Sequence, residues 1–177
     1  MIKKFQLLFW VFSLFCSCSS TSKHSRLAHG LIDAFSKKMK NTQHLYCYGK
    51  GGALSNDVKT IMLSYVGYQR FNVEQSRKLY INIVEDFLLM INSNAEINPY
   101  LHSHPFSINN LELGLAFYAE KDKFIEQPYI AYVLIVNEII YYCVNDPSKT
   151  DNSLKVVSEE PYVEALKIVR GNSDAMD

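Results

Sequence analysis

The stretch Leu111-Glu112-Leu113-Gly114-Leu115-Ala116-Phe117-Tyr118 decides the fold, because large apolar residues occupy every second position. This alternation has the two-residue period of a strand with one buried face. Residues 129–136 are apolar almost throughout, as in a central strand that is covered on both faces. Asn137-Glu138 then suits a tight turn, and residues 139–144 return as a third strand. The region near 111–145 therefore predicts an antiparallel meander.

Around this meander, the spacing of apolar residues predicts three helices, at about 26–40, 73–92 and 159–170. The middle helix has the clearest signals, because Asn72 and Gln75 suit a capping box and one side carries an apolar stripe. The stripe consists of Val73, Tyr80, Ile83, Val84, Phe87, Leu88 and Ile91. The last helix would begin at Ser158-Glu159-Glu160-Pro161, a capping residue followed by two acids and a proline.

Two shorter segments, 45–48 and 59–68, predict further strands, with Gly49-Lys50-Gly51-Gly52 as the turn between them. Residues 145–157 are mostly polar and predict a loop. We therefore expect one α+β domain over 26–171, with an antiparallel sheet of three to four strands and the helices packed against it. Residues 172–177 would form a flexible tail.

The N-terminal segment predicts export. Lys3 and Lys4 precede an apolar run of about eleven residues, which is shorter than the roughly 20 that a membrane-spanning helix needs. The segment Phe15-Cys16-Ser17-Cys18 resembles the lipobox of bacterial lipoproteins, although Phe15 stands where leucine is usual. We expect residues 1–17 to be a signal peptide, Cys18 to be the lipidated residue and 18–25 to be a polar tether. The alternative is an uncleaved helix close to the membrane.

The resemblance to lipoproteins implies a diacylglycerol thioether on Cys18 and an acylated amino terminus, and hence membrane attachment through several acyl chains. Ser19 differs from the aspartate that resembles an inner-membrane retention signal, so the outer membrane is favoured. The expected location is the bacterial cell envelope, on the periplasmic or the surface face.

Charge and cysteine content narrow the functional classes. From residue 18 onward there are 16 Lys and Arg against 18 Asp and Glu, so no basic excess favours nucleic acid. Of the four cysteines, Cys47 and Cys143 would remain in the exported domain. They would form a disulfide if their strands were neighbours; otherwise they would be two buried free thiols.

No segment carries a strong catalytic motif. His102 and His104 alternate on an extended segment and could share a metal, but nothing in the spacing selects a third ligand among Glu96, Glu112 and Asp86. We therefore predict no metal and no cofactor. The tyrosines predicted on strands fit cross-strand packing, or an exposed face that binds a glycan or a protein. Those tyrosines are Tyr46, Tyr48, Tyr65, Tyr68, Tyr141 and Tyr142.

Several phrases resemble a family of small uncharacterised lipoproteins of chlamydia-like intracellular bacteria. They are residues 49–65, Val84-Glu85-Asp86-Phe87-Leu88 with Ile91-Asn92-Ser93-Asn94, Pro99-Tyr100-Leu101-His102 with Pro105-Phe106, Asn145-Asp146-Pro147, and Tyr162-Val163-Glu164-Ala165-Leu166-Lys167-Ile168-Val169. The resemblance implies no catalytic residue, and an aromatic residue is usual at the position of His104.

These observations favour an envelope lipoprotein that binds or scaffolds without catalysis. The alternative is an envelope hydrolase, metal-dependent around His102 and His104. A third hypothesis is a secreted or surface-exposed factor that acts on a host. The expected partners are the membrane, through the lipid anchor, and an envelope protein or glycan.

Overall fold

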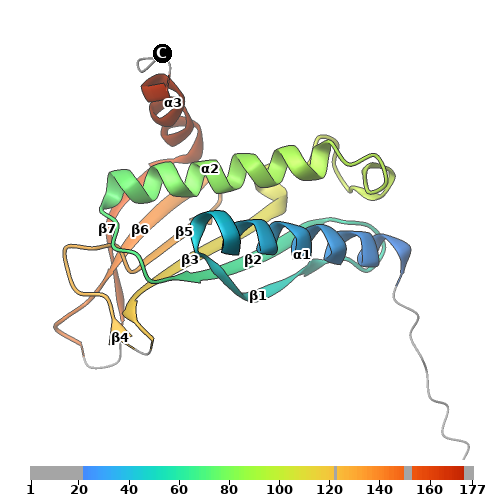
Figure 1. Ribbon diagram of the computed structural model, residues 1–177. Helices are drawn as coiled ribbons and strands as arrows, with labels where there is room; N and C mark the ends of the chain where they lie inside the picture. The colour runs from blue at the N-terminus through green and yellow to red at the C-terminus, as the bar shows by residue number, and fades with distance from the viewer. Residues whose placement is uncertain (1–21, 122, 150–152, 174–177) are drawn as a thin grey trace, which may run out of the picture.

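The computed structural model describes residues 22–121, 123–149 and 153–173, which form three helices, two short 3₁₀ turns and seven strands (Figure 1). In chain order the elements are α1 (Lys23–Gln43), β1 (Tyr46–Ala53), β2 (Thr60–Gly67), α2 (Val73–Asn92), η1 (Asn98–Tyr100), η2 (Ile108–Asn110), β3 (Leu111–Glu120), β4 (Lys123–Phe124), β5 (Tyr132–Val136), β6 (Ile139–Asn145), β7 (Leu154–Pro161) and α3 (Tyr162–Ser173).

All seven strands belong to one sheet in the order β1-β2-β3-β5-β6-β7, with β4 paired to β3. The predicted meander is confirmed, because β3, β5 and β6 are antiparallel neighbours and Asn137 and Glu138 form the tight turn with positive φ. The expected three to four strands understate the sheet. The expectation of a wholly antiparallel sheet was also wrong, because β2 and β3 are parallel. Parallel neighbours need a crossover connection, and α2 supplies it. A helix of 20 residues is about 30 Å long, so α2 carries the chain back to the end of the sheet at which β2 begins.

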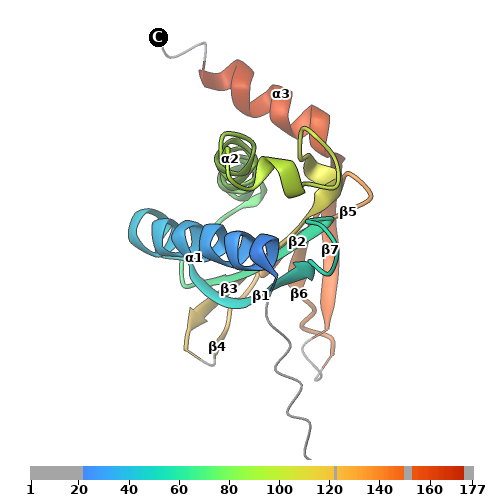
Figure 2. The same ribbon diagram turned by 90° about the vertical axis from the view of Figure 1, so that its right-hand side faces the viewer.

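Helices α1 and α2 lie over the same face of the sheet (Figure 2). The Tyr65 hydroxyl of β2 lies 3.1 Å from the Ser36 hydroxyl of α1, and the Tyr80 hydroxyl of α2 donates to the Leu113 carbonyl of β3. The core therefore lies between these helices and the alternate residues of the strands that point toward them. We call this side of the sheet the covered face.

Local signals set the helix ends. Asn72 and Gln75 form the predicted capping box of α2, and the observed bounds of α2 match the predicted helix. Helix α1 begins earlier than predicted, at Lys23, because the Ser22 side chain accepts from the Ser25 amide. Residues 23–25 therefore belong to α1, and the tether is shorter than expected.

Two segments have a different structure from the prediction. The glycine-rich stretch Gly49-Lys50-Gly51-Gly52 is not a turn: it continues β1, with an irregularity between Cys47 and Gly49. Strand β7 occupies residues predicted as a loop and as the start of the last helix, so α3 starts only at Tyr162. The end of α3 extends into the predicted tail, and residues 174–177 lie outside the described part.

Two glutamates with hydrogen-bond and ion-pair partners connect β7 and α3 to α2. Glu160 of β7 accepts from the Arg77 guanidinium at 2.7 Å and from the Tyr142 hydroxyl at 2.6 Å, with only 12% of the Glu160 side chain exposed. Glu85 of α2 accepts from Tyr162 and pairs with Arg170 of α3. These carboxylates are structural contacts between α2 and the C-terminal elements.

The predicted signal peptide, Cys18 and the first residues of the tether lie outside the described residues. Within the described part, none of the helices has the length and apolar character needed to cross a bilayer.

Candidate functional site

The sheet face opposite α1 and α2, which we call the open face, carries the candidate site. The strand pairings place its residues in rows, because directly paired residues share a face. One row contains Tyr46, Val66, Ala116, Tyr132 and Cys143. The next row contains Gly49, Ser64, Gly114, Leu134 and Tyr141. Three consecutive members of this second row, Gly49, Ser64 and Gly114, are small, so the sheet surface is lower along them.

A hollow of about 440 Å³ lies on this face beside the row of small residues. Met62, Tyr132, Leu134 and Val136 supply its apolar walls, and η2 closes one end through Ile108. Met62 and Val136 remain 38% and 47% exposed, which shows that the hollow is open to solvent. The site can therefore receive an apolar group of a few side chains in size.

Gly114 and Tyr132 together shape the floor of the hollow. A β-carbon at position 114 would lie only 2.3 Å from the Tyr132 hydroxyl, so the ring can lie across β3 only because residue 114 is glycine. Tyr48 of β1 lies near enough, across β2 and β3, to influence the Tyr132 hydroxyl. Burial, together with Tyr48, raises the pKa of Tyr132 to about 12, so this ring is neutral at physiological pH.

The acidic and amide side chains of the hollow lie at one end. Glu112 and Glu138 are both exposed, and the Asn109 amide donates to Glu138 at 2.7 Å. No Lys, Arg or His lines the described hollow. The site therefore favours a partner that is apolar in its centre and neutral or cationic at this end.

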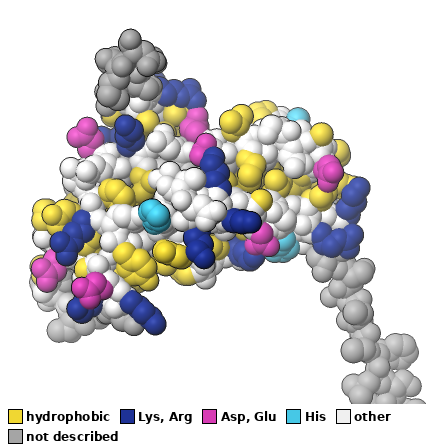
Figure 3. Space-filling view, viewed as in Figure 1, with side chains coloured by type: hydrophobic (Ala, Val, Ile, Leu, Met, Phe, Trp, Pro, Cys, Tyr) yellow, Lys and Arg dark blue, Asp and Glu magenta, His cyan; other side chains and the backbone are white. Residues whose placement is uncertain are grey.

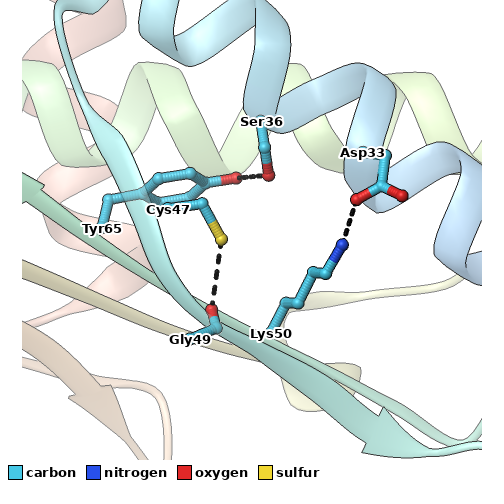
Figure 4. Close-up of polar contacts among 6 residues, drawn as sticks. All are labelled: Asp33, Ser36, Cys47, Gly49, Lys50 and Tyr65. Carbon is cyan, nitrogen blue, oxygen red and sulfur yellow. Dashed lines mark hydrogen bonds and ion pairs between the residues drawn. The ribbon is translucent and has the colours of Figure 1, made fainter.

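A second, smaller hollow of about 210 Å³ lies between α1 and β1 on the covered face. Figure 4 shows its polar contacts: Asp33 pairs with Lys50, Ser36 with Tyr65, and the Cys47 thiol donates to the Gly49 carbonyl. Each of these polar groups therefore has a partner. The first two pairs connect α1 to the sheet, and the third lies within β1.

Of the two alternatives for Cys47 and Cys143, the structure has free thiols, with Cys143 buried and Cys47 half-buried. Strands β1 and β6 are not neighbours, because β2, β3 and β5 lie between them. The thiols also lie on opposite faces: Cys47 pairs with Tyr65 of the covered face, whereas Cys143 pairs with Tyr132 of the open face. Burial raises the pKa of the Cys143 thiol, which makes it less reactive.

His102 and His104, the candidate metal ligands, are exposed on the loop before η2. His102 Nδ1 lies 2.7 Å from a carboxylate oxygen of Asp57, a partner in the β1–β2 connection that no sequence spacing indicated. The proposed third ligands are elsewhere: Asp86 pairs with Lys38 on the covered face, and Glu112 lies at the hollow. In the described ranges no three His, Cys, Asp or Glu side chains form a group suited to a metal.

The tyrosines on the strands divide between the two predicted roles. Tyr65 and Tyr142 are fully buried on the covered face, as the packing interpretation predicted. Tyr46, Tyr48 and Tyr68 are 42%, 60% and 44% exposed, and the Tyr46 and Tyr68 rings lie 6.3 Å apart. The sequence did not indicate which tyrosines belong to which group, because the irregularity in β1 changes the alternation there.

Comparison with protein-family models, with curated proteins and with solved structures found no match to this chain. The lipobox and the family resemblance therefore remain predictions from the sequence.

Proposed function

We propose that this protein is a lipid-anchored, non-catalytic binding module of the bacterial cell envelope. Its anchor is the diacylglyceryl group expected on Cys18, and its binding surface is the open face of the sheet. The hollow over Gly114 is the observation that carries this proposal, because it is an apolar depression on a surface that the described helices leave uncovered.

The chemistry of the hollow favours a protein segment over a glycan. Its walls are side chains of Met62, Leu134 and Val136, whereas, apart from Ser64 and the Tyr132 hydroxyl, its polar side chains lie where η2 meets the β5–β6 turn. A sugar would leave most of its hydroxyl groups unpaired against such walls, which costs free energy. Apolar side chains of another envelope protein would bury surface there without that cost.

The hydrolase hypothesis receives no support from the loop that carries His102 and His104. A hydrolytic zinc site needs three protein ligands and an open position for water. His102 contacts one carboxylate, that of Asp57, and Asp57 was not among the expected ligands.

The binding surface is tested by crosslinking in the intact envelope. A photoreactive phenylalanine analogue replaces Leu134 in the hollow, and a matched variant carries the analogue at Lys167, an exposed residue of α3. We expect a discrete crosslinked protein band from position 134 and none from position 167. Identical patterns from the two positions would overturn the assignment of the open face.

The anchor is tested separately through metabolic labelling with radioactive palmitate. The wild-type chain should incorporate the label, and the Cys18→Ala variant should not. Continued labelling of the Cys18→Ala variant would exclude Cys18 as the lipid site.

A further inference from the structure

The exposed side of α1 is strongly basic. The helix contains five Lys and Arg but one acid, Asp33. Lys23, Arg26, Lys37 and Lys40 are all exposed, whereas the residues that α1 buries are apolar. Figure 3 shows Lys and Arg side chains at intervals along the band that α1 occupies in Figure 1. We call Lys23, Lys37 and Lys40 the basic stripe.

The contacts around α1 leave the stripe its positive charge. The one acid of the helix, Asp33, pairs with Lys50 of β1 (Figure 4). Lys38 pairs with Asp86 of α2. Lys23 and Lys40 lie 5.9 Å from the ring centroids of Tyr100 and Tyr46, contacts that keep the cations in place without neutralising them.

The charge of the rest of the chain has the opposite sign. With α1 set aside, the chain from residue 18 onward holds 11 Lys and Arg against 17 Asp and Glu. A protein with a net charge of −2 from residue 18 therefore has a positive helix on a negative body. An anionic surface would attract α1 and repel the remainder, which orients the molecule.

The length of the tether places this helix next to the membrane. Four residue steps separate Cys18 from Ser22, the N-cap of α1, and fully extended chain spans at most about 3.6 Å per residue. The start of α1 would thus lie within about 14 Å of a lipidated cysteine. Because about 14 Å is the upper limit, the tether lets the first turn of α1 come within about 8 Å of surface phosphates, the screening length at physiological ionic strength, and at that range its charges interact with them.

We propose that the basic stripe of α1 lies flat against an anionic phospholipid surface and orients the tethered protein on it. The lipid anchor at Cys18 belongs to the proposed function, whereas the charge of α1 is independent of it. Cations at both ends of a helix that is about 30 Å long favour a helix parallel to the surface, because Lys23 and Lys37 then both reach phosphates. The open face lies on the other side of the sheet from α1, so it would point away from the membrane toward a partner.

The geometry is tested with the full-length lipidated protein in vesicles. One set contains only phosphatidylcholine, and in the other a third of the lipid is phosphatidylglycerol. Lysines are labelled with an amine reagent that does not cross membranes, and each site is quantified by mass spectrometry. On anionic vesicles we expect labelling of Lys23 and Lys37 to fall several-fold relative to Lys167 of α3, and high salt to restore it.

Two results of this labelling would overturn the proposal. Equal labelling on both vesicle types would show that phosphate charge does not hold α1 at the surface. Protection of Lys23 without Lys37 would show that the helix stands on end.

A second experiment uses the unlipidated chain that starts at residue 22, so that binding through the basic stripe is measured without the anchor. All residues of the hydrophobic core lie between Ala28 and Ala165, so this form retains the whole core. We expect it to cosediment with phosphatidylglycerol vesicles at low salt. Each basic side chain near such a surface contributes about five-fold in affinity, so Lys37→Gln with Lys40→Gln should weaken binding about 25-fold.

The matched control is Lys149→Gln with Lys155→Gln, an equal loss of charge at exposed positions next to and within β7. It should bind as the unsubstituted chain does. Equal weakening in both double variants would overturn the stripe and leave the lipid anchor unaffected. Absence of the palmitate label from the wild-type chain, with cosedimentation of the unlipidated chain intact, would overturn the anchor alone.

Discussion

The two faces of the sheet are built from alternate residues of the same strands, yet they differ in almost every property. On the covered face, Leu113 and Leu115 of β3 are at most 3% exposed and contact the helix layer. On the open face, their neighbours Glu112 and Gly114 border a hollow that is open to solvent. One strand can therefore contribute both to the core and to a site, because its successive side chains point to opposite faces of the sheet.

The small residues of the open face explain why it remains a hollow. Gly49, Ser64 and Gly114 follow one another across three strands, where the covered face has large side chains such as Leu63. Filling the same positions with large residues would give a flat apolar surface. Stability therefore depends on the covered face, and the shape of the site depends on the missing side chains of the open face.

The largest expected effect is a difference in unfolding free energy between substitutions on the two faces. Leu115→Ala removes a side chain with no exposed surface and leaves a cavity, so it should lower the free energy of unfolding by about 3 kcal/mol. Leu134→Ala on the open face truncates a half-buried side chain and should lower it by about 1 kcal/mol or less. Unfolding by urea, followed by circular dichroism, measures both. Equal losses would mean that the open face also supports the core.

A smaller effect is expected at the floor of the hollow. The β-carbon of Gly114→Ala would collide with the Tyr132 ring, which must move, so we expect a loss of about 1–2 kcal/mol. Tyr132→Ala removes the obstacle, and Gly114→Ala should then be nearly neutral in that background. The four proteins of this cycle are compared by urea unfolding. An undiminished cost of Gly114→Ala without the ring would show that backbone strain, not Tyr132, requires glycine.

The sequence predicted those parts of the fold whose signals are local. The capping box of Asn72 and Gln75 and the apolar stripe of α2 both lie within one helix. The alternation of β3 reports one covered face, and the meander follows from short connections. In each case residues close in sequence carry the whole signal.

The remaining features depend on contacts between distant segments. Strand β7 is an edge strand with mostly exposed residues, so its composition resembles a loop. The glycines of β1 signal a turn locally, but pairing with β2 holds them extended. The hollow brings together Ser64 of β2 and Gly114 of β3, and the contact of His102 with Asp57 spans 45 positions. No periodicity within one segment indicates such neighbours.

The smallest expected effect is the pH dependence of stability that comes from one buried tyrosine on each face. Burial raises the pKa of Tyr65 on the covered face to about 12, with a hydrogen bond to Ser36 as a weaker opposing influence. The folded pKa exceeds the unfolded value, so the neutral ring stabilises the fold fully below about pH 10. This contribution is lost as pH rises from about 10 toward 12.

Tyr65→Phe should therefore have opposite consequences at the two ends of this pH range. At neutral pH it removes the hydrogen bond to Ser36 and should lower the free energy of unfolding by about 1 kcal/mol. Above pH 10 the variant should lose stability less steeply than the wild type, because one buried hydroxyl no longer has to ionise. Tyr132→Phe should behave alike on the open face, since burial there raises its pKa to a similar value. Urea unfolding across this range measures both slopes; a slope unchanged by Tyr65→Phe would mean that the Tyr65 hydroxyl ionises as freely in the folded protein as in the unfolded chain.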